Sequence, residues 1–392
     1  MVGRGGFPQG FLSRSVFLPP EPTPLGSPPL RILLVASAIR VPGTHGGSTH
    51  VSELLRNLSR IGPTLLLGAR GSEGENVKGI GFDIGYPWGL RNVLPFYYFL
   101  RALPAVVEFG PTVIYERASS YGLGTMFSKA LGIPLLCMVL DEHYSQFSLD
   151  HASRIIATDL DLVPKDVRHK AVKVSWGANT DLFRRDLSGA GVRLRFGLGS
   201  SPVIGYMGSF KSWHGLPFLV EAAVRMRDRP LRFLLIGDGP YRREIEALVA
   251  SSGVADRFCF TGAVPYEKVP ELLAAADICV APFDPTRHPH SADGFVLDPL
   301  KVFEYLAMVK PTVTIRADNI ERLFRDGEHL RLFEARNVDA FVEAITSLLD
   351  HPEQAKVMAE AGYTKVITEF TWNAHANHLA SLFREMLAAP QR

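Results

Sequence analysis

The chain has 392 residues, and two domains are expected because one hydrophobic core rarely serves more than about 250 to 300 residues. With 46% hydrophobic and 21% charged residues, it has the composition of a globular protein that folds in water. Its net charge of +2 is too small to indicate nucleic acid as the main partner.

The three cysteines, Cys137, Cys259 and Cys279, lie in separate apolar segments and lack the spacing of metal ligands. We interpret them as buried free thiols in a reducing compartment, and we predict a cytoplasmic protein without a metal site. No transmembrane helix is predicted, because no apolar run reaches about 18 residues. The aromatic segment 93–109 is interpreted as a buried helix, with peripheral contact to the inner face of a membrane as the alternative.

Residues 1–29 are rich in Gly, Pro and Ser, which predicts a disordered or extended tail. A buried strand is then expected over 30–36, followed by a glycine-rich turn and an amphipathic helix. Apolar strands alternate with helices from there to residue 176, so 30–176 is predicted to be a Rossmann-like domain with a parallel sheet. Its other strands are expected at 64–67, 112–115, 135–139, 154–157 and 172–175, with helices near 93–109 and 121–131.

Residues 177–200 lack a regular pattern and are predicted to be a connector. The alternation of strands and helices restarts after it, so 201–370 is predicted to be a second Rossmann-like domain. Residues 371–392 are expected to form a helix that packs back on the first domain. The second domain's strands are expected at 203–207, 232–236, 258–261, 278–282 and 312–315, with helices at 216–227, 241–251, 266–275, 299–308, 338–349 and 352–370.

The segment from Asp298 to Glu304 combines a helix start with unusual charges. Asp298 is predicted to be the N-cap and Pro299 the first helical residue, which places Lys301 in the first turn. A cation there opposes the helix dipole by a few tenths of a kcal/mol up to about 1 kcal/mol, and a bound anion would reverse the sign. Because Glu304 follows three residues later on the same face, the pair indicates a site for a phosphate beside a sugar hydroxyl. The alternative is an ion pair on a solvated face.

Seven segments follow one another in an order that resembles the GT-B glycosyltransferases, specifically the retaining group called family 4, across residues 30–388. The segments are Gly46-Gly47-Ser-Thr-His50, Tyr115-Glu-Arg117, Gly208-Ser-Phe-Lys-Ser-Trp-His-Gly215, Leu235-Ile-Gly-Asp-Gly-Pro240, Phe260-Thr-Gly-Ala-Val264, Ala275-Ala-Asp-Ile-Cys-Val-Ala-Pro282 and Pro299-Leu-Lys-Val-Phe-Glu-Tyr305. The resemblance implies two Rossmann-like domains that face each other across a cleft, with further helices at the C-terminus. It also implies transfer of a sugar from a UDP- or GDP-sugar to an acceptor hydroxyl, with retention and without a tightly bound cofactor or metal.

The resemblance also implies roles for individual residues. Glu304 would accept hydrogen bonds from the donor ribose, and Lys301 would lie near the diphosphate. Lys211, with His214 as a second candidate, would neutralise the leaving nucleoside diphosphate. Glu142 or His143 is expected beside the reacting sugar. The other expected donor contacts are Gly46, Gly47, Gly208, Ser209, His214, Gly237, Gly262, Val264 and Leu300, and the expected acceptor-side residues are His50, Tyr115 and Arg117.

Several of these residues also have simpler interpretations. His50 could only begin a helix, and Asp238 could only form a turn. Tyr115 and Arg117 could pack at the edge of the core. Trp213 could anchor its loop instead of stacking on a ligand.

The sequence departs from the family pattern at the first of its two motif glutamates, where it has Val296. Ser209 and His214 also stand where Lys or Arg is common. Two further interpretations therefore stay open: a nucleotide-sugar hydrolase or epimerase of the same architecture, and a non-catalytic nucleotide-sugar-binding subunit. The acceptor is expected to be a glycan, a lipid-linked or cell-surface polysaccharide precursor, or a small molecule.

Overall fold

A computed structural model describes residues 29–43, 45–81, 93–117, 120–140, 144–288 and 299–389. The first part of the chain forms a seven-stranded sheet in the order β3-β2-β1-β4-β5-β6-β7, and every pairing is parallel. Its strands are β1 (Ile32–Ala36), β2 (Thr64–Ala69), β3 (Val77–Gly81), β4 (Val113–Arg117), β5 (Leu135–Val139), β6 (Arg154–Ala157) and β7 (Ala171–Lys173), and its helices are α1 (Gly46–Ser59), α2 (Leu94–Phe109), α3 (Leu123–Leu131) and α4 (Gln146–His151).

The apolar run of β1 is buried on both faces of this sheet, as a central parallel strand requires. Leu34 faces a core that includes Leu54 of α1. Leu33 faces a second core, which Tyr98 of α2 and Phe127 of α3 share. The period-two alternation of the strand therefore divides its side chains between two helical layers.

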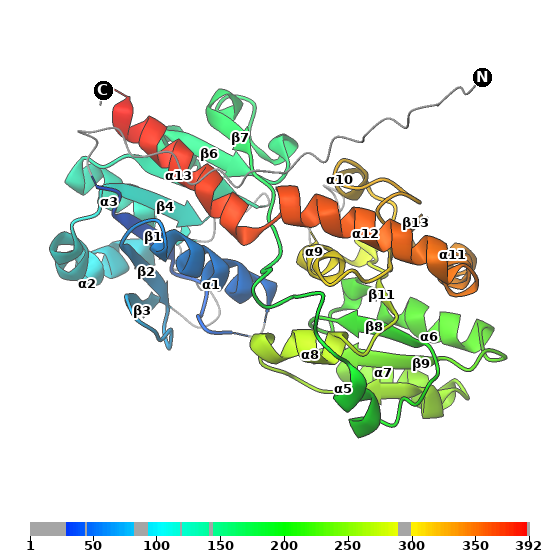
Figure 1. Ribbon diagram of the computed structural model, residues 1–392. Helices are drawn as coiled ribbons and strands as arrows, with labels where there is room; N and C mark the ends of the chain where they lie inside the picture. Colours follow the sequence, from blue (N-terminus) through cyan, green and yellow to red (C-terminus); the bar gives the residue numbers. More distant parts are fainter. Residues whose placement is uncertain are drawn as a thin grey trace, which may run out of the picture.

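The second part of the chain repeats this arrangement in a six-stranded parallel sheet of order β10-β9-β8-β11-β12-β13 (Figure 1). Its strands are β8 (Val203–Met207), β9 (Arg232–Ile236), β10 (Phe258–Phe260), β11 (Ile278–Ala281), β12 (Thr312–Ile315) and β13 (Arg331–Phe333). The helices of this part and of the C-terminus are α5 (Ala190–Arg195), α6 (Leu216–Arg225), α7 (Arg242–Ser251), α8 (Val269–Leu273), α9 (Leu300–Ala307), α10 (Asp318–Glu321), α11 (Val338–Asp350), α12 (Pro352–Glu369) and α13 (Trp372–Ala388).

The chain crosses between the two sheets twice, and the crossings lie side by side. Ala178 of the connector donates its N–H to the Phe370 carbonyl at 2.9 Å and accepts from the Trp372 N–H at 3.2 Å. Beyond this point, α13 runs back along α1 of the first domain, whereas α12 packs against α9 of the second (Figure 1). The C-terminal helices therefore hold on to both domains.

The predicted α/β class with two parallel sheets is confirmed, while several short elements were not predicted. Neither β3 nor β13 has a strand signal in its sequence, because β3 contains two glycines and β13 has only three residues at a sheet edge. The connector, predicted to be irregular, contains α5. Pro299 occupies the N-cap of α9 instead of its first helical position, and Asp298 lies outside the described residues.

Within the described residues, none of the helices has both the length and the apolar character that spanning a bilayer requires.

The close contact at Gly215 gives a test of the fold. Gly215 and Gly253 both have positive φ angles, +68° and +74°. A Cβ at Gly215 would lie 1.6 Å from the Pro282 carbonyl oxygen, whereas a Cβ at Gly253 would meet nothing within 4 Å. We expect Gly253→Ala to cost about 1 to 2 kcal/mol for its left-handed backbone alone. Gly215→Ala should cost a further 1 to 3 kcal/mol or so through overpacking. Urea denaturation measures both, and equal losses would contradict this packing.

Candidate functional site

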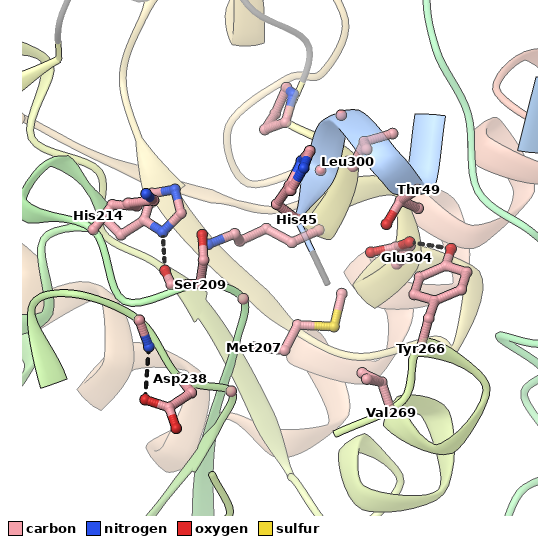
Figure 2. Close-up of a pocket in the computed structure, with 18 of the residues that line it drawn as sticks. His45, Thr49, Met207, Ser209, His214, Asp238, Tyr266, Val269, Leu300 and Glu304 are labelled. Atoms are coloured by element: carbon pink, nitrogen blue, oxygen red, sulfur yellow. Dashed lines mark hydrogen bonds between the residues drawn. The ribbon is translucent and has the colours of Figure 1, made fainter. Parts of the chain in front are cut away.

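A cavity of about 930 Å³ lies between the two domains, at the carboxyl ends of the parallel strands. The first domain contributes the loop before α1 and the end of β4, and the second contributes the loops after β8 and β9 and the start of α9. Figure 2 shows Glu304 and Tyr266 at one side of this cavity and Ser209 and His214 at the other. The predicted site residues that line it are Gly46, Gly47, Arg117, Gly208, Ser209, Lys211, His214, Gly237, Val264, Leu300, Lys301 and Glu304.

The amino group of Lys301 lies between aromatic rings at the mouth of α9. Its Nζ is 4.4 Å from the centre of the Tyr206 ring and 4.9 Å from that of Phe283, and it donates to Tyr206 Oη at 3.2 Å. Although the residue as a whole is only half-buried, its amino group is desolvated, and this lowers the pKa of Lys301 to about 7. An anion in the cavity would favour the charged form of such a group.

Glu304 is the second ionisable group at this helix mouth. It is 4% exposed, and its Oε1 accepts a hydrogen bond of 2.5 Å from Tyr266 Oη (Figure 2). Burial raises the pKa of Glu304 to about 8, although the Tyr266 bond opposes the shift. The alternative of an ion pair on a solvated face is therefore wrong. Lys301 and Glu304 instead present one amino group and one carboxyl group to the cavity.

Glycines bring the backbone close to the Lys301 amino group. Gly208, directly after β8, has a φ of +134°, and a Cβ there would lie 2.9 Å from Lys301 Nζ. A Cβ at Gly237, after β9, would lie 2.1 Å from the Gly208 carbonyl oxygen. Any side chain at either position would fill this space, so both loops depend on glycine. Gly262 does not itself line the cavity. It pairs with Gly237 through an isolated β-bridge and so supports the loop after β9.

The loop from Gly208 to Gly215 contributes a cation and a neutral histidine. The Nδ1 atom of His214 is hydrogen-bonded to the Ser209 carbonyl and lies 3.0 Å from Tyr206 Oη (Figure 2). Burial, followed by the nearby Lys301 charge, lowers the pKa of His214 well below its ordinary value. His214 therefore does not supply the positive charge that the resemblance implied. Lys211, whose Nζ lies 5.7 Å from the centre of the Trp213 ring, is the cation of this loop.

Among the residues of the cavity that sequence reasoning missed, His45 and Tyr266 bear most directly on its chemistry. His45 is the N-cap of α1, and its Nδ1 accepts from the Ser48 N–H at 3.3 Å. Burial and the charges of Arg117 and Lys211 lower the pKa of His45, so it presents a neutral ring to the cavity. Tyr266, the partner of Glu304, is the other. A histidine directly before the Gly46-Gly47 pair was a possible N-cap signal, whereas nothing near Tyr266 in sequence indicated its role.

Two predicted acceptor-side residues lie in the core instead of the cavity wall. His50 is fully buried, 4.9 Å from the Trp176 ring centre and 5.4 Å from that of Trp372. Tyr115 is also fully buried, with its Oη 2.7 Å from Met138 Sδ. Tyr115 lies in the middle of β4, so its side chain packs against the helical layer. Arg117 lies on the same face of β4 but is the last residue of the strand, so its side chain reaches the cavity.

The remaining predictions concern Asp238 and residues outside the described ranges. Asp238 accepts at Oδ1 from the Gly239 N–H at 2.7 Å, as a turn residue does, and its other oxygen pairs with Arg242 at 3.1 Å. Glu142, His143 and Val296 lie outside the described residues.

A family model described as glycosyl transferases group 1 matches residues 201–351, in the second domain. The alpha-D-kanosaminyltransferase of Streptomyces kanamyceticus is 24% identical over 291 residues, which are 67% of this chain and 73% of that protein. The GDP-mannose-dependent alpha-(1-6)-phosphatidylinositol monomannoside mannosyltransferase of Mycolicibacterium smegmatis is 28% identical over 209 residues, 53% of this chain and 54% of that protein.

Solved structures of similar shape cover nearly the whole chain. Sucrose-phosphate synthase from Thermosynechococcus elongatus has a TM-score of 0.75 at 20% identity, over 92% of this chain and 99% of that one. HepE from Anabaena, solved in complex with UDP, has a TM-score of 0.71 at 16% identity, over 91% of this chain and 100% of that one. The fold is therefore the GT-B fold. The family model covers the second domain, and both relatives are named glycosyltransferases, so the chain is similar to the glycosyl transferases of group 1.

The raised pKa of Glu304 has a consequence for stability that can be measured. The folded-state pKa of about 8 lies above the ordinary 4.5, so the folded protein retains a proton that the unfolded chain releases. Stability from this group is complete below about pH 4.5 and is lost as the pH rises towards 8. We expect Glu304→Gln, which stays neutral, to stabilise the ligand-free protein at pH 8 by on the order of 1 to 3 kcal/mol.

At pH 5 the same substitution should change the free energy of unfolding by much less, because the wild-type carboxyl is then neutral in the folded state. Urea denaturation at the two pH values measures the difference. Destabilisation of equal size at both would contradict the buried, protonated carboxyl.

Proposed function

We propose that this protein is a retaining glycosyltransferase that moves a sugar from a nucleoside diphosphate donor, UDP- or GDP-linked, to an acceptor hydroxyl. The observation that carries the proposal is the pairing of Lys301 and Glu304 at one helix mouth that opens into the interdomain cavity. The UDP complex of HepE, which has the same fold, supports a donor of this class.

In this proposal the diphosphate binds between the loop after β8 and the start of α9. Lys301 and Lys211 line that part of the cavity, and the glycine at 208 lets the phosphate approach the Lys301 amino group. The anion favours the protonated amine and raises the pKa of Lys301 again. Charge that develops on the departing diphosphate is then stabilised by groups already in place, which is the largest single contribution in many enzymes.

Glu304 is proposed to bind the ribose of the donor. A carboxylate accepts hydrogen bonds from two adjacent hydroxyls, and Glu304 faces the cavity with Tyr266 as its only bonded partner among the described residues. Because the free carboxyl holds a proton near neutral pH, donor binding would release that proton while Lys301 takes one up. Both groups would thus change from neutral to charged when the donor binds, the Lys301 ammonium beside the diphosphate and the Glu304 carboxylate beside the ribose.

The proposed reaction needs no protein nucleophile. The bond between the anomeric carbon and the phosphate oxygen breaks, and a bond from that carbon to the acceptor oxygen forms on the same face. The acceptor proton passes to the departing phosphate oxygen, which leaves on the nucleoside diphosphate. The neutral His45 and the Arg117 side chain lie on the first-domain wall of the cavity, where an acceptor would enter.

The acceptor is proposed to be a glycan, a lipid-linked precursor or a small molecule. One relative is named for the kanosaminyl group that it transfers, and the other is named for a phosphatidylinositol monomannoside, which is a lipid-linked acceptor. The proposed location is the cytoplasm, with peripheral contact to the inner face of a membrane.

Substitution of the two helix-mouth residues tests the proposed function. We expect Lys301→Ala and Glu304→Ala each to lower kcat/KM at least about a hundredfold, since each removes a charged partner from a closed site, worth on the order of 3 kcal/mol. The measurement is initial-rate kinetics with the nucleotide sugar that most raises the melting temperature of the wild-type protein.

Lys310→Ala is the matched control. Lys310 follows α9 and donates to the Ala274 and Ala276 carbonyls at 2.9 and 2.7 Å, away from the cavity. Its loss should lower stability and leave donor affinity unchanged. Near wild-type turnover of both helix-mouth variants would overturn the assignment. Release of free sugar without an acceptor would instead indicate a hydrolase, and donor binding without turnover a binding subunit.

A further inference from the structure

Helix α2 has an apolar side that faces solvent. It packs on the first sheet through Pro95, Tyr98, Ala102 and Val106, a stripe with helical spacing. The other side of a surface helix is normally polar. Here it carries large apolar side chains that are more than half exposed, namely Phe96 (54%), Tyr97 (54%), Leu100 (53%) and Val107 (56%), and Val93 (62%) directly precedes it.

The exposed apolar residues of α2 differ from other exposed apolar residues of the described chain because several of them lie on one side of one helix. Leu194 and Val357 are also strongly exposed, at 86% and 71%, but they lie singly on α5 and α12. Scattered apolar residues of that kind are normal, whereas a contiguous apolar patch marks an interaction surface. On α2 the patch lies at the outer edge of the first domain, away from the second domain (Figure 1).

Two cations border the patch and share a second cavity. Arg101 of α2 and Lys78 of the edge strand β3 both line a cavity of about 260 Å³ between that strand and the helix. Both side chains are exposed, and neither forms an ion pair with another residue of the described part of the chain. Arg101 follows directly after Leu100, so the cavity adjoins the apolar side of the helix.

We propose that this side of α2 binds the surface of a membrane that contains anionic phospholipids. Phe96, Tyr97 and Leu100 enter the boundary between headgroups and acyl chains, and a lipid phosphate lies between Lys78 and Arg101. This surface would provide the peripheral membrane contact given under the proposed function. The proposal rests on the proposed function in one respect, namely that the membrane would bring a lipid-linked acceptor within reach of the cavity.

The chemistry of the patch favours a lipid surface over a second copy of this chain. A 16-residue helix is roughly 24 Å long and about 10 Å wide, so its side covers about 240 Å². A stable protein interface takes about 800 Å² from each partner. Phe and Tyr with an adjacent Arg are, by contrast, the residues that interfacial helices place at headgroup level. The two cations add attraction to an anionic leaflet.

Co-sedimentation with lipid vesicles tests the proposal on the full-length protein. The vesicles are phosphatidylcholine alone and phosphatidylcholine with phosphatidylglycerol as the anionic component. We expect the wild type to bind the anionic vesicles at least tenfold more tightly. The double variant Phe96→Ser with Leu100→Ser should lose at least tenfold in affinity for them, because two exposed apolar groups no longer enter the interface.

Charge reversal and a matched control separate the contributions. Lys78→Glu with Arg101→Glu should remove the preference for anionic vesicles, at about fivefold or more for each cation. Val357→Ser removes an even more exposed apolar side chain elsewhere and should bind as the wild type does. All of these positions are exposed, so thermal unfolding and nucleoside diphosphate binding should be unchanged in every variant, which shows that the fold and the donor site persist.

Three results would overturn the proposal. They are no binding of the wild type to either vesicle, equal binding of the Phe96→Ser, Leu100→Ser variant, and a concentration-dependent dimer that this variant abolishes. None of them bears on donor binding or on turnover with a soluble acceptor, so failure here and failure of the proposed function are distinguishable.

Discussion

The central physical constraint in this protein is the burial of an amino group and a carboxyl group at the start of one helix. In the ligand-free protein both Lys301 and Glu304 are desolvated, which lowers the pKa of the first to about 7 and raises that of the second to about 8. Burial of ionisable groups such as these lowers the stability of the folded protein, and such groups are typical of binding sites. Gly208 leaves the space beside the Lys301 amino group open, and the hydrogen bond from Tyr266 holds the Glu304 carboxyl in place. The two buried groups thus lower the stability of the ligand-free protein and are already in position to bind a charged ligand.

The junction between the domains connects this site to the rest of the chain. Glu53 of α1 is 1% exposed and accepts from Asn179 Nδ2 of the connector at 2.7 Å. Four residues beyond Asn179, Phe183 lies 5.5 Å from the Tyr266 ring centre, and Tyr266 donates to Glu304. The charge of Glu53 also contributes to the raised pKa of both Tyr266 and Glu304. Burial is the main cause of both shifts, and the Glu53 carboxyl of the first domain lies close enough to add to them.

The sequence predicted what depends on local pattern. The buried parallel strands β5, β6 and β8 consist mostly of apolar residues, and their predicted bounds match the structure. The placement of Lys301 and Glu304 together at the start of α9 could be predicted, because a helix start and three-residue spacing need no tertiary information. The pairing of Tyr266 with Glu304 joins residues 38 apart and could not be inferred in that way. The burial of His50 depends on α13, which returns from the far end of the chain.

The most direct test of the central claim compares nucleoside diphosphates with and without ribose hydroxyls by calorimetry. The ligands are UDP or GDP, whichever binds more tightly, and its 2′,3′-dideoxy form, each titrated into wild type and Glu304→Ala. If the Glu304 carboxylate accepts from the ribose, removal of the hydroxyls weakens binding to the wild type by about tenfold to a hundredfold, as loss of hydrogen bonds to a charged group does. In the variant the same removal then costs less than about twofold, because the interaction is already lost. An equal loss in both proteins would contradict the account.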